Sequence, residues 1–304
     1  MIMDSLHNNE LEGRLDAGRL VKPENYIANK DAAPDLQSLI DELDPRLIKA
    51  RGLDEFLNVE RDFLPRVVCL PTTMLVAIRH LTDSRLLTLR DFYELGIYSQ
   101  INDRQTNSGV EKGFPSFHYK MLDTYLRYAL EFAKVAGLYG GIITNFSDLS
   151  FSKLVLTKGV IIPSVDNLFI PAAMNRNLDP SSFKPSRHTE LVHAIAGNDL
   201  VVTDVTNYRN GEFWETKNIL VRKTLVEEHL TCPRLNDFFT RAIILTKDQA
   251  SWEQLAPELT NYGKIVEPNY NPIIKPFFGQ GVATALESIR TKANQGLAQW
   301  EMID

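Results

Sequence analysis

The chain has 304 residues, a mass of 34.5 kDa and 44% hydrophobic residues, values typical of a globular protein with one large domain or two. This composition excludes collagen-like and disordered proteins, and the longest uncharged stretches, 67–78 and 135–147, are shorter than the ~18–20 residues of a membrane-spanning helix. The N-terminus lacks the features of a secretory signal, and there are only two cysteines, Cys69 and Cys232. We therefore expect an intracellular protein of a reducing compartment, without a membrane-bound part.

The net charge of −6 comes from the first 60 residues, which hold 13 acidic and 7 basic residues, whereas the remaining 26 acids and 26 bases balance. Pro23, Pro34 and Pro45 interrupt this segment, because a proline disfavours helix at the residue before it. We expect residues 1–60 to form an acidic N-terminal arm with short helices. Such an arm either docks on a neighbouring subunit or is a poorly ordered terminus.

Helical patterns dominate the next part of the chain. Apolar residues at helical spacing predict two helices within 67–95, the second with Ser84 as its N-cap, and a polar loop at 101–114. A longer helix is predicted for 115–136, ending at Gly137. It carries an aromatic stripe at steps of three and four residues, which we interpret as core rather than as a cofactor-binding surface: Phe117, Met121, Tyr125, Tyr128 and Phe132.

From residue 151 the pattern changes to short β-rich runs, at 153–163 and 167–173. We expect a helix at 186–197, then strands at 200–206 and 211–221 joined by the turn Asn210-Gly211, because both turn residues tolerate a positive φ. The remaining predicted elements are helices at 223–230, 234–247, 249–261 and 282–300, with a proline-rich connector at 268–276 before the last.

Together these elements predict an α+β fold with a mainly helical body and a β-containing insert. The helical, shell-like body would comprise 61–150 and 223–304, and the insert, a candidate projection, would comprise 151–222 with its hairpin near 200–221.

Most catalytic motifs are absent from the sequence. It contains no phosphate-binding glycine loop and no G-x-S-x-G nucleophile motif, and neither cysteine has a histidine at a meaningful spacing. His188 and His193 are five residues apart, so on a helix they would diverge by ~140° and could not share a metal ion. We interpret both as partnered structural histidines.

One constellation has the residue types of a catalytic site. Asp204 falls on the first predicted hairpin strand, and Glu215 and Lys217 fall two residues apart on the second, where their side chains would share a face. Two such carboxylates could hold Mg²⁺ while the lysine steadies the attacking water or the developing charge. This pattern resembles the PD-(D/E)xK nucleases, and the resemblance implies that Glu190, in the preceding predicted helix, supplies a further acid. The alternative interpretation is a solvent-facing charged strand edge.

A second resemblance concerns the chain as a whole. The segments that prompt it are 236–245 (NDFFTRAIIL) and 252–262 (WEQLAPELTNY), with 204–208 (DVTNY) upstream. With them the chain is similar to the capsid proteins of partitivirus-like double-stranded RNA viruses. This resemblance implies a structural protein of the virion or host cytoplasm, with no active site, metal or cofactor, that assembles with copies of itself from dimers by arm exchange. Because the body is electrically balanced, we expect at most weak, non-specific contact with RNA.

The sequence thus leaves two functional hypotheses. The first is a self-assembling capsid subunit, and the alternative is a Mg²⁺-dependent nuclease that uses Asp204, Glu215 and Lys217, with Glu190 in support.

Overall fold

A computed structural model describes residues 20–42, 68–98, 122–174, 185–205, 208–209, 212–213, 216–266, 287–288 and 291–292. The chain divides into two compact units. Unit 1 comprises Met1–Tyr26 and Tyr139–Glu267, and unit 2 comprises Ile27–Leu138 and Pro268–Asp304. Within the described ranges, no helix combines the length and the hydropathy needed to cross a bilayer.

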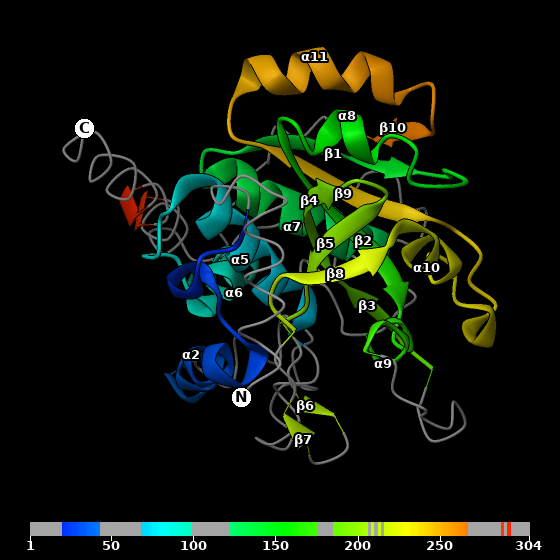
Figure 1. Ribbon diagram of the computed structural model, residues 1–304. Coiled ribbons are helices and arrows are strands. Elements are labelled where there is room, and N and C mark those ends of the chain that lie inside the picture. The colour runs from blue at the N-terminus through cyan, green and yellow to red at the C-terminus, as the bar shows by residue number, and fades with distance from the viewer. Residues whose placement is uncertain are drawn as a thin grey trace. The chain divides into compact units, whose positions relative to one another are not determined.

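Unit 1 is built on an eight-stranded sheet in which every pairing is antiparallel (Figure 1). The strands follow the order β10-β1-β9-β2-β4-β5-β8, and β3 pairs with the end of β2. The strand bounds are β1 Tyr139–Thr144, β2 Gly159–Asp166, β3 Arg187–Thr189, β4 Leu191–Ala196, β5 Asp199–Thr203, β8 Ile219–Arg222, β9 Arg241–Thr246 and β10 Lys264–Val266. A separate hairpin pairs β6 (Tyr208–Arg209) with β7 (Glu212–Phe213).

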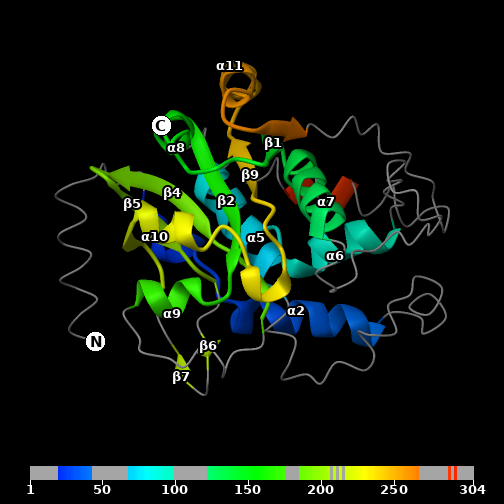
Figure 2. The ribbon, with the colours of Figure 1, turned by 90° about the vertical axis from the view of Figure 1, so that its right-hand side faces the viewer.

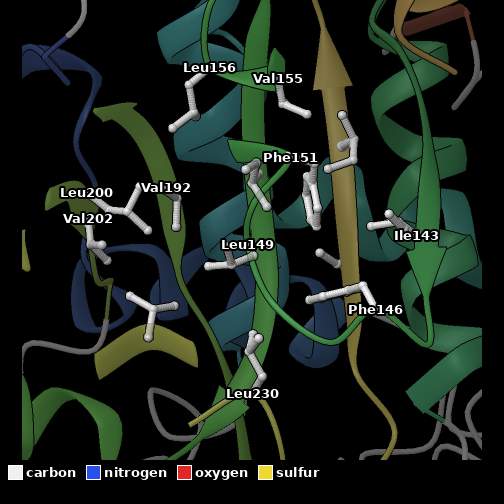
Figure 3. Packing of buried hydrophobic residues seen from close by; sticks show 14 of the residues in the cluster. Ile143, Phe146, Leu149, Phe151, Val155, Leu156, Val192, Leu200, Val202 and Leu230 are labelled. Atoms are coloured by element: carbon white, nitrogen blue, oxygen red, sulfur yellow. The ribbon is translucent and has the colours of Figure 1, made fainter. Parts of the chain in front are cut away.

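Helices of unit 1 cover one face of this sheet (Figure 2). They are α8 (Ser152–Val155), α9 (Phe169–Ala173), α10 (Lys223–Glu228) and α11 (Gln249–Leu259). Residues of the loop before α8, among them Leu149 and Phe151, insert between these elements and the strands, as Figure 3 shows. Gly141 lets α11 approach β1, because a Cβ there would lie 2.7 Å from the ring of Trp252. The resulting apolar core is the main source of stability in this unit.

The N-terminal segment of unit 1 packs against strands β4, β5 and β8. Leu20 joins a small buried cluster with Ala194 and Val201. The side chain of Asn218 holds the backbone of Val21 in both directions, accepting from its N–H at 3.0 Å and donating to its carbonyl at 2.9 Å. Residues 20–21 therefore dock on the sheet of their own chain.

Unit 2 is helical in its described part. Helix α5 (Cys69–Thr82) packs on α2 (Asn29–Glu42), α6 (Leu89–Tyr98) and α7 (Leu122–Val135). Phe92 and Phe132 pack edge to face with ring centroids 5.0 Å apart, a favoured aromatic geometry. Lys292 forms an ion pair with the buried Asp91 and ties the C-terminal part of the chain to this group.

The mainly helical body with a β insert is wrong as a description of the fold. The sheet draws its strands from residues 139 to 266, so β1, β9 and β10 come from segments that were assigned to the helical body, and β9 lies near the middle of the sheet. The molecule is therefore organised around an antiparallel sheet in one unit and helices in the other.

Three individual predictions failed for a shared reason. The expected helix at 186–197 is β3 and β4, the expected helix at 234–247 contains β9, and the expected β run at 167–173 is α9. In β4 and β9 nearly every residue is buried on both faces, so the alternation of polar and apolar residues that marks a half-exposed strand is missing. In short apolar runs of this kind the sequence does not distinguish the periodicity of a strand from that of a helix.

Other predictions are confirmed in the described residues. Helices α5, α7, α10 and α11 lie where the spacing placed them, and Gly137 follows α7 with a φ of 87°. Helix α6 is present but begins at Leu89, so Ser84 is not its N-cap. Strand β5 lies within 200–206 apart from its first residue, whereas the second predicted strand is divided into β7 and β8. The register of β6 and β7 places a two-residue turn at Asn210-Gly211, although the turn itself lies outside the described residues, as do 101–114, 268–276 and most of 282–300.

Candidate metal centre

Three side chains of unit 1 converge on one point, and we call them the ligand cluster: His188, Glu190 and Asp204. One ligand atom from each lies within 4.8 Å of the others. Nε2 of His188 is in hydrogen-bond contact with Oδ1 of Asp204 at 2.7 Å and lies 3.3 Å from Oε1 of Glu190. An imidazole and two carboxylates therefore meet within bonding range of a single ion.

The sheet brings these residues together through register. His188 lies on β3 and Glu190 two residues later, between β3 and β4, so the two side chains share a face of the extended chain. In the β4–β5 ladder Leu191 is opposite Thr203, and continuing this register by one residue places Glu190 opposite Asp204. Directly opposite residues share a face with Cβ atoms ~5 Å apart, which accounts for the convergence.

The backbone of Asp204 is fixed by three further contacts. Its N–H donates to the carbonyl of Thr216 at 2.9 Å, and its carbonyl accepts from the hydroxyls of Thr216 at 2.9 Å and Tyr26 at 3.1 Å. Asn218, with a φ of 55°, lies in a turn just before β8, and Thr216, directly before this turn, is bonded to Asp204. The carboxylate of Asp204 thus projects from a rigid backbone.

The ligand cluster is buried, with exposed fractions of 5% for His188 and 0% for both Glu190 and Asp204. Two carboxyl groups and an imidazole are thus gathered away from solvent. Imidazole nitrogens and carboxylate oxygens are the ligand groups that divalent metal ions bind in proteins.

The donor set also fits a metal ion geometrically. At metal–ligand distances of ~2.0–2.2 Å, neighbouring ligands lie ~2.8–3.6 Å apart in octahedral or tetrahedral coordination. The separations of 2.7 and 3.3 Å within the cluster are close to this range. One imidazole nitrogen with two carboxylate oxygens suits Zn²⁺ or Mn²⁺ better than Mg²⁺, which prefers oxygen ligands.

A neighbouring group of charges, the arginine corner, is arranged differently; it comprises Arg187, Arg234, Arg241, Asp166 and Asp237. Asp237 accepts from Arg187 and Arg241 at 3.1 Å each, and Asp166 accepts from Arg234 at 2.7 Å. Burial would raise the pKa of Asp237, but the Arg187 hydrogen bond and both guanidinium charges outweigh it and keep that pKa below its ordinary value.

The pKa of Asp166 is set by the same opposing effects of burial and hydrogen bonding. Burial by itself would raise the pKa of this carboxyl, and hydrogen bonds from Arg234 and Cys232 hold it below its usual range. The same contact changes the thiol, because burial and the adjacent Asp166 carboxylate raise the pKa of Cys232 to about 11. Cys232 is therefore a protonated structural thiol at neutral pH.

The structure brings two of the four residues expected at the nuclease-like site together. Asp204 follows β5 directly, and Glu190 lies beside it in a strand connection rather than on a helix. Lys217 lies half-buried in the turn before β8, next to Thr216, so it does not belong to a regular strand. Glu215 lies outside the described residues.

Sequence reasoning missed His188. The argument that His188 and His193 diverge assumed a helix, but both lie on strands, and the bulge at His193 turns that ring to the hydroxyl of Thr203 at 3.1 Å. The available signal was the pattern His188-x-Glu190, which on an extended chain places an imidazole and a carboxylate on one face.

Comparisons with known proteins give no guide to the activity: no family model, no curated protein and no solved structure matches this chain.

Proposed function

We propose that this chain is a hydrolase that depends on a divalent metal ion and cleaves phosphate esters, with His188, Glu190 and Asp204 as the metal ligands. The observation that carries the proposal is the convergence of their three ligand atoms within 4.8 Å in a buried setting. Three protein ligands leave a coordination position for water or substrate, as in catalytic zinc sites.

A bound divalent ion would supply a water of lowered pKa and would polarise a phosphoryl oxygen. The residues of the chain orient and balance that ion: Asp204 from its fixed backbone, and Glu190 from the opposite strand. Lys217 supports a phosphate ester as the substrate, because it is a half-buried cation one residue from Thr216, the residue bonded to Asp204. This proposal revises the Mg²⁺-dependent nuclease by adding the imidazole ligand.

Metal titration tests the centre directly. Titration of the EDTA-treated chain with Co²⁺ or Zn²⁺, followed by calorimetry and by the visible spectrum of Co²⁺, is expected to show one site per chain. Asp204→Asn should weaken that site at least ~100-fold, beyond the usual cost of losing a supporting group. His193→Gln is the matched control, because His193 is a buried histidine outside the cluster. Absence of a stoichiometric site in the natural chain would overturn the proposal.

Activity is tested with a chromogenic phosphodiester and the metal that binds most tightly. Hydrolysis should be lost in EDTA, return on metal addition, and be lost in Asp204→Asn but not in His193→Gln. Hydrolysis that is indifferent to EDTA would contradict the metal-dependent mechanism.

A second candidate is favoured by the 2.7 Å bond between His188 and Asp204. A carboxylate that orients an imidazole is also the base of hydrolases with a thiol or hydroxyl nucleophile. Cys232 does not fit that role, because its thiol is fully buried with a pKa of about 11. Hydrolytic activity that resists EDTA and requires His188 would favour this candidate over the metal centre.

Self-assembly stays a prediction. The sheet-centred fold differs from the mainly helical, shell-like body with which the capsid hypothesis was combined, so we give the hydrolase precedence. Light scattering coupled to gel filtration at physiological salt tests the capsid hypothesis: a closed particle in the megadalton range would support it, and a monomer at micromolar concentration would reject it.

A further inference from the structure

Two adjacent phenylalanines are the most exposed large apolar residues in the described part of the chain. Phe238 is 63% exposed and Phe239 is 62% exposed, whereas Leu86, Tyr139 and Tyr262 reach 39–40%. Leaving two phenyl groups in water forgoes the stabilisation that burial would give each of them. An exposed apolar surface of this kind indicates a binding site for a ligand that covers the two rings.

The loop that carries these rings is rigid. Nη2 of Arg187 donates to the carbonyls of Asp237 and Phe239, at 3.1 Å each, and the carboxylate of Asp237 accepts from the N–H of Phe239 at 3.2 Å. The hydroxyl of Thr240 closes the loop by donating to the carbonyl of Phe146 at 2.6 Å. Because the loop is already ordered, a ligand that binds it loses little conformational entropy.

Positive charge lies beside the rings. The guanidinium of Arg241 stands 5.8 Å from the centre of the Phe239 ring. Thr144 pairs with Arg241 on one side and with Lys264 on the other, so these side chains share one face across three strands, and Lys264 is exposed. Arg187 and Arg241 both pair with Asp237, and the exposed Lys264 adds a positive charge beside them, which favours an anionic ligand.

We infer that Phe238 and Phe239 form a stacking platform for the bases of single-stranded nucleic acid, whose phosphates Arg241 and Lys264 attract. A stable protein interface needs about 800 Å² and ~20–30 residues from each partner, more than two rings supply. A base needs a single aromatic face, and such stacking is worth ~1–3 kcal/mol per base. The modest positive charge predicts weak binding that depends on salt, in agreement with the balanced body of the chain.

The platform gives the proposed hydrolase its substrate class, and in this respect the inference rests on the proposed function. Arg187, which holds the loop, is followed directly by His188 of the ligand cluster on β3. Substrate binding and the metal centre thus share one short strand. Binding itself requires no metal, so the two proposals can fail separately.

Fluorescence anisotropy of a labelled dT12 oligonucleotide, in EDTA and 50 mM salt, tests the platform. The natural chain should bind in the micromolar range. Phe238→Ala and Phe239→Ala should each weaken binding ~5–150-fold, the range that corresponds to loss of one stacked base. Tyr139→Ala is the matched control, because it removes an exposed aromatic residue at the other end of β1 and should leave binding unchanged.

Leucine replacements separate stacking from general apolar contact. Phe238→Leu and Phe239→Leu should not restore binding, since leucine lacks a π face. Undetectable binding by the natural chain, unchanged binding in the alanine variants, or full rescue by leucine would each overturn the platform. A dimer seen by light scattering and lost in the double alanine variant would assign the surface to a second copy of the chain instead.

Glu190→Gln separates this inference from the metal centre. It should lose metal binding and keep its affinity for dT12. In the natural chain, a stoichiometric metal site without oligonucleotide binding would reject only the platform, and oligonucleotide binding without a metal site would reject only the metal centre.

Discussion

The ligand cluster and the arginine corner are neighbours in unit 1, yet the carboxylates of the two groups have different partners. In the corner each carboxylate meets at least one guanidinium, and the pKa values of Asp166 and Asp237 are held low. In the cluster two carboxylates meet a single imidazole. Arg187 and His188, adjacent on β3, belong to the two different groups.

The difference teaches how to separate structural from functional charge by the partners that each buried carboxylate meets. A charge network that is balanced by its own side chains is accounted for by its contribution to the stability of the fold. A buried cluster of one imidazole and two carboxyl groups instead has the donor set of a metal site, and for this cluster we propose a divalent ion. Four predictions test this contrast, beginning with the largest expected effect.

Arg187→Met should break the arginine corner. This guanidinium is 4% exposed, neutralises Asp237, and donates to the carbonyls of Leu230 and Phe239. Removal of one partner of a buried ion pair costs ~3–5 kcal/mol. Because Arg241 still pairs with the partly exposed Asp237, we expect a loss at the lower end of this range. Urea unfolding measures the loss. A loss below 1 kcal/mol would mean that Asp237 reaches solvent and that the corner is not a buried network.

Glu190→Gln should have two effects of opposite sign in the ligand cluster. Metal affinity should fall ~100-fold, equivalent to ~2.7 kcal/mol of binding free energy. In EDTA the same variant should be more stable than the natural chain by about 1 kcal/mol, because one of two neighbouring buried negative charges has gone. Calorimetry and urea unfolding measure the two quantities. Reduced stability in EDTA would place Glu190 in a balanced network like that of the corner.

Acid should weaken the arginine corner. Because the pKa values of Asp166 and Asp237 are lowered in the folded chain, both carboxylates bind fewer protons folded than unfolded. The stability they contribute is complete above the ordinary value of 3.8 and is lost as the pH falls through their lowered values. Urea midpoints from pH 6 to pH 2 should fall in the natural chain and fall less steeply in Asp237→Asn. An unchanged slope in that variant would exclude Asp237 as a contributor.

The sequence allowed some elements to be predicted because their signals are local. Helix α11 has an N-cap residue and a helical apolar face, and Gly137 ends α7. Strands β4 and β9 gave no such signal: they are buried on both faces, and only their neighbours in the sheet, which are distant in sequence, make them strands. The sheet-centred fold follows from these long-range pairings, which periodicity does not report.

The candidate site, like the fold, was predicted only in part from the sequence. Asp204 was identified on a predicted strand, and Glu190 was named through the nuclease resemblance as an acid of the preceding predicted helix; the structure places the two side by side. His188 was dismissed because its segment was taken for a helix. Lys217 lies in the turn at Asn218, for which the sequence offers only an asparagine able to adopt a positive φ. The two errors at the site are thus consequences of errors in secondary structure.

The smallest expected effect concerns a carboxylate that belongs to neither group. Asp248 caps α11 by accepting from the N–H of Ser251 at 2.7 Å and from its hydroxyl at 2.9 Å, in an exposed position. Asp248→Ala should cost ~1 kcal/mol of unfolding free energy, the usual value of an N-cap, and should leave metal and oligonucleotide binding unchanged. Urea unfolding measures this loss, and Asp248→Asn, which keeps the acceptor oxygen, should recover most of it. Because the carboxylate of Asp248 is solvated, its replacement measures the cost of a lost hydrogen bond without the cost of a disrupted buried ion pair. A loss of unfolding free energy as large as that of Arg187→Met would contradict the difference between exposed and buried carboxylates.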